Sequence, residues 1–228
     1  MKIGGLMNLT LLDYPDKVAC TVFTVGCNFR CPFCHNNSLV LGNGGRRLAV
    51  NEVLGFLEKR KNVLDGVCLT GGEPLIQQGV EEFLLDVKRL GYSVKLDTNG
   101  AFPDRLRELA EKGLVDYVAM DVKNSKERYE ESVGCKTDIQ AICRSVEFLK
   151  SGKVEYEFRT TVTGNHHDEI SIGNMSRWLA GASKLYLQKF VNSGDLIDPN
   201  TVGCSDETMR RYLEIAKKYL PNAELRGI

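Results

Sequence analysis

Short apolar runs typical of strands alternate with apolar residues at helical spacing along most of this chain. Strand–helix–strand alternation is typical of right-handed units built around a parallel sheet. We therefore predict an α/β fold, a partial (βα)6 TIM-like barrel, although periodicity alone leaves a flat doubly wound sheet open. Because no linker or low-complexity stretch interrupts the alternation, we expect a single domain over residues 1–228.

Glycine, proline and aspartate mark the ends of several of these segments. Gly91 and Gly113 are expected to end helices, whereas Pro103 and Asp138 are expected to begin them. The strands are predicted at residues 18–25, 66–70, 93–97, 116–120, 154–162 and 183–191. The helices are predicted at residues 50–61, 80–90, 103–113, 138–149, 175–181 and 205–219.

Charge and hydropathy argue against two classes of partner. Thirty basic residues balance thirty acidic ones and are dispersed, whereas a nucleic-acid-binding domain usually carries a basic patch. No apolar run reaches the roughly 18 residues that a membrane-spanning helix needs. The N-terminal segment lacks the long apolar stretch and the small-residue cleavage site of a signal peptide. We expect a cytoplasmic protein with no nucleic-acid partner and no membrane partner.

Three of the eight cysteines, Cys27, Cys31 and Cys34, lie within the stretch CNFRCPFC. Disulfides are rare in the reducing cytosol, so tightly spaced cysteines there indicate metal or cluster binding. Three thiolates on an iron–sulfur cube leave one iron without a protein ligand, and therefore open to a substrate or cofactor. A zinc site completed by His35 or Cys204 is the alternative, although zinc sites are usually built from C-x2-C pairs.

Polar and glycine-rich segments follow nearly every predicted strand. The cysteines follow the first strand, TGGEP (70–74) the second, DTNG (97–100) the third and DVK (121–123) the fourth. The fifth strand carries Arg159 and the sixth carries Gln188. Ligand sites of parallel α/β folds lie at the carboxyl ends of the strands, so we expect these segments to form one site.

The glycine pair Gly71 and Gly72 has two interpretations. The pair could form only a tight turn, for which glycine is the usual residue. Alternatively, the missing side chains let the backbone approach a ligand while Glu73 accepts a hydrogen bond from an ammonium group. Such a charge-assisted bond contributes about 1.5 to 3 kcal/mol.

The polar residues after the third and fourth strands are equally open to two interpretations. Asp97 and Asn99 could merely end a strand, and Asp121 could only pair with Lys123. Their position on adjacent strand ends favours a binding site.

The other histidines and cysteines are expected to be structural. We expect the adjacent His166 and His167 to be solvated loop residues, and Cys20 and Cys68 to be buried in the core. Three further cysteines are too widely spaced to predict a second cluster: Cys135, Cys143 and Cys204.

The motif C-x3-C-x2-C with an aromatic residue before its last cysteine, followed by GGE, DTNG and DVK, resembles the radical S-adenosylmethionine (SAM) superfamily over most of the chain. The resemblance implies that Cys27, Cys31 and Cys34 hold a [4Fe–4S] cluster whose open iron is chelated by the amino and carboxylate groups of SAM. Phe33 matches the position that contacts adenine. The methionine-binding turn is matched by Gly71, Gly72 and Glu73.

The segment LLDYPDKVACTVFTVGCNFRCPFCHN is similar, more narrowly, to the start of glycyl-radical enzyme activating proteins. The likeness is to the anaerobic ribonucleoside-triphosphate reductase activating type and its pyruvate formate-lyase activating relatives. This resemblance implies that Lys123 and Arg159 contact SAM. It also implies a monovalent cation beside the SAM carboxylate, surrounded by Asp97, Thr98 and Asp121.

The chain departs from those relatives late in the sequence. Gln188 occupies the strand end nearest to a histidine position of the relatives, which affects the adenosine end of the implied site. The inserted ferredoxin-like cysteine pairs of some activases are also missing, so a single cluster is implied.

The resemblance implies an enzyme that uses the cluster to cleave SAM into methionine and a 5′-deoxyadenosyl radical. The implied partners are a glycyl-radical enzyme, in particular anaerobic ribonucleotide reductase, and a flavodoxin or ferredoxin that donates the electron. Three alternatives stay open: a pyruvate formate-lyase activating enzyme, a radical SAM enzyme acting on a small molecule, such as the 7-carboxy-7-deazaguanine synthase type, and a zinc-binding structural module.

Overall fold

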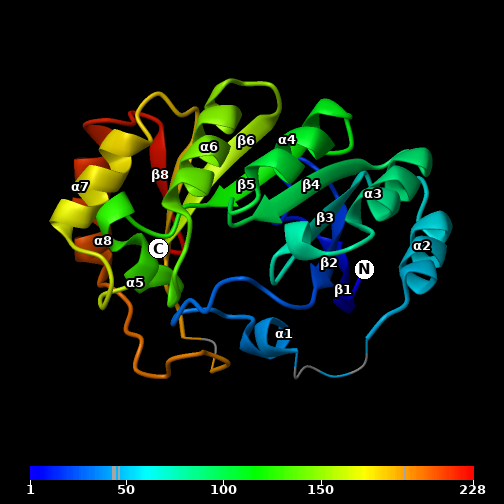
Figure 1. The fold of residues 1–228 in the computed structure, drawn as a ribbon, viewed down its shortest axis with the longest axis horizontal. Helices are drawn as coiled ribbons and strands as arrows, with labels where there is room; N and C mark the ends of the chain where they lie inside the picture. Colours follow the sequence, from blue (N-terminus) through cyan, green and yellow to red (C-terminus); the bar gives the residue numbers. More distant parts are fainter. Residues whose placement is uncertain (43–44, 46, 193) are drawn as a thin grey trace.

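The computed structural model describes residues 1–42, 45, 47–192 and 194–228 (Figure 1). Its strands form one eight-stranded sheet in which spatial order follows sequence order. All strands from β2 to β8 run parallel, whereas β1 runs antiparallel to β2. The strands are β1 (Ile3–Thr10), β2 (Ala19–Thr24), β3 (Gly66–Gly71), β4 (Ser93–Thr98), β5 (Tyr117–Asp121), β6 (Glu155–Val162), β7 (Leu185–Lys189) and β8 (Ala223–Arg226).

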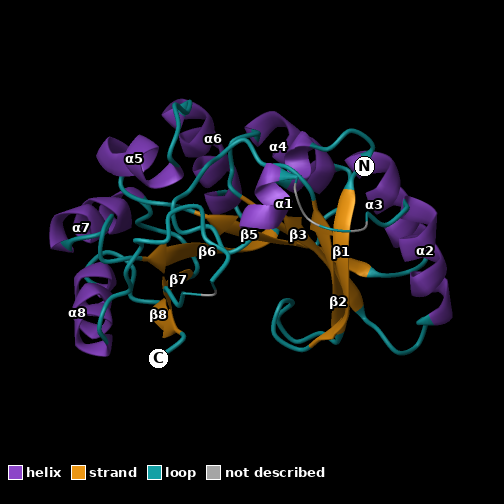
Figure 2. Cartoon of the chain, turned by 90° about the horizontal axis from the view of Figure 1, so that it is seen from below, coloured by secondary structure: helices purple, strands orange, loops and turns teal. Residues whose placement is uncertain are grey.

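The sheet curves into an open arc. Figure 2 shows β1 and β2 on one side of the arc and β8 on the other, and these outer strands β1 and β8 are the two edges of the sheet. Most helices lie on the convex side (Figure 2). The predicted α/β fold with a partial barrel is therefore confirmed.

Every predicted strand is present, as β2 to β7, and the structure adds one strand at each edge. The first, β1, was missed because Gly4 and Gly5 lie inside it and interrupt its apolar pattern. The second, β8, is only four residues long.

The helices are α1 (Asn37–Leu41), α2 (Val50–Lys59), α3 (Val80–Arg89), α4 (Pro103–Glu111), α5 (Tyr129–Val133), α6 (Ile139–Lys150), α7 (Glu169–Trp178) and α8 (Asp206–Lys217), with short 3-10 turns at Pro74–Ile76 and Lys126–Arg128. The short α1 and α5 were not predicted. The start of α7 was predicted too late, because Asp168 accepts a hydrogen bond from Ser171 N at 2.7 Å and so caps the helix at a position that apolar spacing does not detect. Among the described residues, every helix is too short or too polar to traverse a bilayer.

Alternation along β4 shows how the sheet separates the core from the concave side. Val94 and Leu96 are fully buried and belong to the same apolar cluster as Phe83 of α3. Burying one such side chain stabilises the fold by about 1.5–3 kcal/mol. Lys95 and Asp97 alternate with them and therefore point to the concave side. The packing of the apolar face thus fixes the direction of the polar residues.

Candidate active site

A cavity of about 200 Å³ lies where β3 to β6 end, beside the loop of residues 27–34 that follows β2 and is here called the cysteine loop. It brings together the three predicted cysteines, the glycine pair and the predicted charged residues. Of the residues predicted for the site, Glu73 and Gln188 lie outside its lining. The cavity is lined by Cys27, Phe29, Cys31, Phe33, Cys34, His35, Asn36, Val40, Thr70, Gly71, Gly72, Asp97, Thr98, Asn99, Asp121, Lys123, Arg159 and Thr161.

The cysteine loop is held by backbone contacts from distant parts of the chain. Arg30 N donates to Val133 O at 2.8 Å, and Asp198 N donates to Pro32 O at 2.9 Å. Gly134 lies so close to the loop that a Cβ there would be 2.3 Å from Arg30 O. The loop is therefore fixed between the end of α5 and the segment that joins β7 to α8.

The segment between β7 and α8 also contacts the residues just after the last cysteine. Ser38 N donates to Asp195 Oδ2 at 3.2 Å. The rings of His35 and Phe190 stack with their centroids 5.2 Å apart. These contacts hold this end of the cysteine loop against a part of the chain made much later.

The three thiols share one electrostatic environment. Burial raises the pKa of Cys27 to about 11 and that of Cys31 to about 12, and it also raises the pKa of Cys34. The positive charge of Lys123 opposes the shift at all three. Because thiolates are the form that binds metals, loading this site would release protons. In the part of the chain that the structure describes, no group of three or more His, Cys, Asp or Glu side chains is arranged to hold a metal ion.

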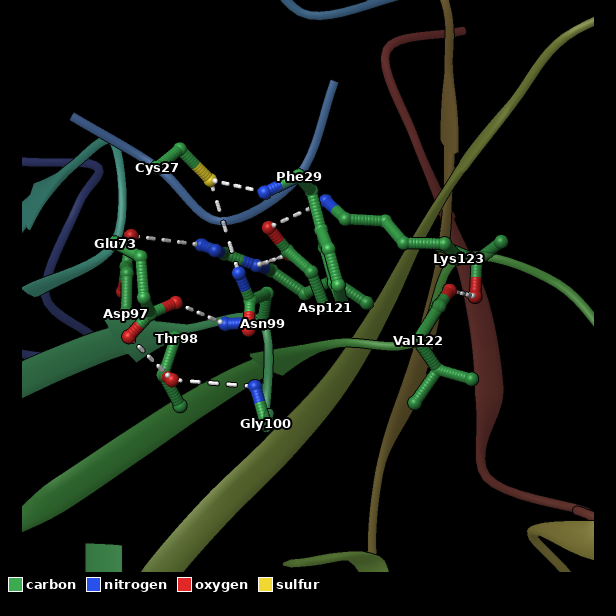
Figure 3. A network of polar contacts seen from close by, with 12 residues as sticks. Cys27, Phe29, Glu73, Asp97, Thr98, Asn99, Gly100, Asp121, Val122 and Lys123 are labelled. Carbon is green, nitrogen blue, oxygen red and sulfur yellow. Dashed lines mark hydrogen bonds and ion pairs between the residues drawn. The ribbon is translucent and has the colours of Figure 1, made fainter. Parts of the chain in front are cut away.

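Cys27 Sγ receives hydrogen bonds from two nitrogen donors (Figure 3). Phe29 N lies 3.4 Å from the sulfur and Asn99 Nδ2 lies 3.8 Å from it. The same amide nitrogen donates to Asn28 Oδ1 at 2.8 Å, which orients the Asn99 side chain. Such donors stabilise negative charge on a ligand sulfur.

The turn after β3 packs tightly against the start of the cysteine loop. A Cβ at Gly71, where φ is +112°, would lie 2.3 Å from Thr24 N, and a Cβ at Gly72 would lie 1.9 Å from Gly26 O. Gly72 N donates to Thr24 O and Glu73 N donates to Gly26 O, both at 2.9 Å. Glycine is needed here for backbone-to-backbone packing, and both glycines still line the cavity.

Glu73 is fully buried behind the cavity. Its carboxylate accepts hydrogen bonds from Leu75 N at 3.0 Å, Thr98 Oγ1 at 2.9 Å and Asn99 N at 2.7 Å. Burial raises its pKa to about 7, against the opposing effect of these three donors. Glu73 therefore fixes the turn after β4, and its predicted contact with an ammonium group stays a prediction.

Charged residues from three strands form a continuous network on the concave side (Figure 3). Arg159 on β6 joins two carboxylates, with Nη1 3.2 Å from Asp97 Oδ2 and Nε 2.9 Å from Asp121 Oδ1. Lys123 Nζ lies 3.1 Å from Asp121 Oδ2, and Lys95 Nζ pairs with Asp97 Oδ1. The predicted pairing of Asp121 with Lys123 is thus present, but within a larger network.

The network keeps its carboxylates charged. Burial alone would raise the pKa of Asp97, but Arg159 and Lys95 hold it below its usual value. The pKa of Asp121 is held far below its usual value by Arg159 and Lys123, again against burial.

Sequence reasoning missed Lys95. Its signal was a basic residue between the apolar Val94 and Leu96, two positions before Asp97 and therefore on the same side of the sheet.

The prediction that both histidines are solvated is wrong for His167. Its side chain is buried, with Nδ1 accepting from Thr163 N at 3.2 Å and Nε2 lying 3.0 Å from Lys123 O. Desolvation lowers its pKa to about 4, so the ring is neutral at pH 7. His166 packs against Phe33 of the cysteine loop, with ring centroids 5.8 Å apart. The polar sequence around His167 gave no sign that this histidine is buried and contacts the backbone of a site residue, Lys123.

The cysteines outside the loop are distributed over several elements. Cys20 and Cys68 are fully buried, as predicted. Cys135 lies against the cysteine loop, with Sγ donating to Asn28 O at 3.5 Å. The partly exposed cysteines outside the loop are Cys135, Cys143 and Cys204.

Sequence comparison places the chain among known proteins. The sequence model of the radical SAM superfamily matches residues 21–179. A protein of Methanocaldococcus jannaschii, named provisionally as a glycyl-radical enzyme activating enzyme, is 32% identical over 99% of this chain and 96% of its own length. The pyruvate formate-lyase-activating enzyme of Clostridium pasteurianum is 32% identical over 54% of this chain and 52% of its own length.

Structural comparison shows the same fold. A radical SAM methyltransferase from Sphaerobacter thermophilus aligns with a TM-score of 0.75 and 15% identity, over 96% of this chain and 68% of that one. At this identity the likeness concerns the fold alone. Since the superfamily model covers most of the chain and the archaeal relative nearly all of it, the chain belongs to the radical SAM superfamily and, within it, to the enzymes that activate glycyl-radical enzymes.

Proposed function

We propose that this enzyme cleaves SAM reductively at a [4Fe–4S] cluster and generates a glycyl radical on a partner protein. The observation that carries the proposal is the convergence of Cys27, Cys31 and Cys34 with the charged strand ends on one cavity. When bound, the cluster supplies one electron to the sulfonium of SAM, which yields methionine and a 5′-deoxyadenosyl radical that takes a hydrogen atom from a glycine α-carbon.

The donor set of the cysteine loop fits such a cluster. Three thiols line the same cavity, and a [4Fe–4S] cluster held by them would have one iron without a protein ligand, available to SAM. Lys123 contributes positive charge at all three sulfurs, which favours their thiolate forms. Phe29 N and Asn99 Nδ2 are already directed at Cys27 Sγ, as expected for donors around a cluster ligand.

The charged residues of the cavity are suited to the amino-acid end of SAM. Lys123 and Arg159 line the cavity and would bind the carboxylate through charge-assisted hydrogen bonds, worth about 1.5–3 kcal/mol each. Asp97 also lines the cavity but already pairs with Lys95 and Arg159, so Glu73 stays the proposed acceptor for the ammonium group.

The remaining site residues are assigned to the methionine and adenosine parts of SAM. Gly71, Gly72 and Asn99 line the cavity where the methionine end would lie, and the buried Phe33 lines it between two cluster ligands, where a ring could contact adenine. Gln188 lies on β7 outside the lining, and its proposed contact is with the adenosine end of SAM.

The proposed partner is a glycyl-radical enzyme, and anaerobic ribonucleoside-triphosphate reductase is the specific candidate. The name of the archaeal relative supports the class of partner. The similarity of the N-terminal segment to activases of the anaerobic reductase supports the specific choice. A flavodoxin or ferredoxin is the proposed electron donor and the cytoplasm the proposed location, because reduced low-potential donors and reduced thiols coexist there.

A test of the chemistry needs no partner protein. Anaerobically reconstituted enzyme, SAM and dithionite should yield equal amounts of methionine and 5′-deoxyadenosine, and Cys31→Ala should lose this activity while keeping its circular dichroism spectrum. Cys143→Ala, a substitution on α6, is the matched control and should stay active. Cleavage by Cys31→Ala, or colourless protein with stoichiometric zinc, would contradict the proposal.

A second test identifies the partner. Electron paramagnetic resonance after mixing the reduced enzyme and SAM with anaerobic ribonucleoside-triphosphate reductase should show a glycine-centred radical on the reductase. A radical formed only on pyruvate formate-lyase would reassign the partner. Radical formation on neither protein, with consumption of a small molecule instead, would support the small-molecule alternative.

A further inference from the structure

Lys95 is a charged residue in the interior of a strand. Its side chain is 2% exposed, it lies at the centre of β4, and its ammonium pairs with Asp97. Cys68 Sγ, on the neighbouring strand, lies 4.0 Å from Nζ. Lysine is almost never fully buried unless it is paired, because desolvating an ammonium group is costly. Asp97 is therefore the partner that makes this burial tolerable.

The carboxylate oxygens of the two aspartates are all occupied by cations of the chain itself. Asp97 Oδ1 pairs with Lys95 and Asp97 Oδ2 with Arg159. Asp121 Oδ1 pairs with Arg159 and Asp121 Oδ2 with Lys123. Three positive side chains thus surround two negative ones.

Thr98, the remaining residue of the expected cation site, is also engaged. Its hydroxyl donates to Glu73 Oε1 at 2.9 Å and accepts from Gly100 N at 3.2 Å. Small metal cations are bound by oxygen ligands. An added cation bound here by Asp97 or Asp121 would join three positive side chains that already pair with these carboxylates, and it would be repelled by them.

We propose that the ammonium group of Lys95 is a built-in cation of the SAM site and makes an added monovalent cation unnecessary. This inference rests on the proposed function, because SAM is the ligand that the site serves. The SAM carboxylate would then be the third negative group of the network, and it would balance the excess positive charge next to Lys123 and Arg159. Lys95 acts through Asp97 and is a positioning residue.

The experiment compares wild type with Lys95→Met, which keeps a long side chain and removes the charge. SAM affinity of the reconstituted protein and thermal unfolding are measured in KCl, NaCl and choline chloride at equal ionic strength. Wild type should bind SAM with the same affinity in all three salts, within about twofold. Lys95→Met should bind about tenfold more weakly in choline and regain affinity in KCl or NaCl, with a rise in melting temperature specific to those salts.

Controls and contrary outcomes follow from the same measurements. Lys153→Met, which removes an exposed lysine paired with Glu111, should behave like wild type in every salt. About tenfold tighter SAM binding by wild type in KCl or NaCl than in choline would overturn the inference, as would salt-independent behaviour of Lys95→Met. If that variant does not fold, Lys95→Gln replaces it, and the wild-type comparison still decides.

The proposed function can fail separately from this inference. No SAM binding in any salt would contradict the proposed function. In that case the melting temperatures still report whether KCl or NaCl binds wild type, and a salt-specific rise in wild type would overturn the inference as well.

Discussion

His167 Nε2 lies 3.0 Å from the backbone carbonyl oxygen of Lys123, a residue 44 positions earlier in the chain. Since Nδ1 accepts from Thr163 N, the neutral ring carries its proton on Nε2 and donates it to that carbonyl. Tyr212 of α8 in turn donates to His167 O at 3.2 Å. Lys123, just after β5, is therefore held at the cavity by His167 from the loop between β6 and α7, which is itself held by α8.

Replacing His167 with glutamine should change how stability depends on pH. Burial lowers the histidine pKa from 6.5 to about 4, so between these values the unfolded chain binds a proton that the folded chain does not. The contribution of the buried neutral His167 to the free energy of unfolding is fully present above pH 6.5 and is lost as the pH falls toward 4. Urea unfolding should show that the stability advantage of wild type over His167→Gln is about 2 kcal/mol larger at pH 7 than at pH 5. A stability difference between the two proteins that does not change with pH would contradict the conclusion that the ring is buried and neutral.

The contribution of Glu73 to stability should depend on pH in the opposite direction between pH 5 and pH 7. Burial raises its pKa from 4.5 to about 7, so the folded chain binds the proton first and the contribution to stability is lost as the pH rises through 7. The stability difference between wild type and Glu73→Gln should therefore move by about 2 kcal/mol in favour of the variant from pH 5 to pH 7. The same urea titrations test this, and a shift of the other sign would show that the three donors to Glu73 outweigh its burial.

Asn99→Ala should make the cluster harder to reduce. The amide of Asn99 is directed at Cys27 Sγ, and a donor to a ligand sulfur favours the more negative, reduced cluster. A redox titration followed by electron paramagnetic resonance should show about a tenfold lower ratio of reduced to oxidised cluster at a fixed potential, which is 59 mV for one electron. Asn200→Ala, on the loop before α8, is the control. Equal midpoints in all three proteins would show that the bond is absent from the loaded enzyme.

Gly72→Ala should destabilise the protein by about 2–4 kcal/mol. The new Cβ would lie 1.9 Å from Gly26 O, and a backbone oxygen cannot move aside as a side chain can. Gly55→Ala in α2 is the matched control, because nothing lies within 4 Å of its Cβ position. That change should stabilise by about 0.5–1 kcal/mol, since glycine inside a helix is unfavourable relative to alanine. Equal effects at the two positions, measured by urea unfolding, would contradict the proposed packing.

The central strands could be predicted from sequence because their apolar residues are continuous and bounded by polar turns. The edges could not, since an edge strand such as β1 has one free side and tolerates Gly4 and Gly5. Helix α7 begins at Glu169, and its start is set by the cap of Asp168, which apolar spacing does not detect.

Much of the site could also be predicted, because parallel strands bring their carboxyl ends together. That rule located Asp97 and Asp121 and the partner of both, Arg159. It could not locate Lys95, which lies inside a strand, or the burial of His167, which depends on contacts made 44 residues away in the sequence. Hydrogen-bond partners of this kind are set by tertiary packing.

The backbone contact from Asp198 to Pro32 and the side-chain contact from Asp195 to Ser38 determine when the cysteine loop is stabilised during translation. The second contact joins residues 157 positions apart, and a ribosome adds about 5–20 residues per second. The thiols are therefore synthesised roughly ten to thirty seconds before the segment that forms hydrogen bonds with their loop. During translation the nascent thiols therefore lack this support until residues 195–198 have been made.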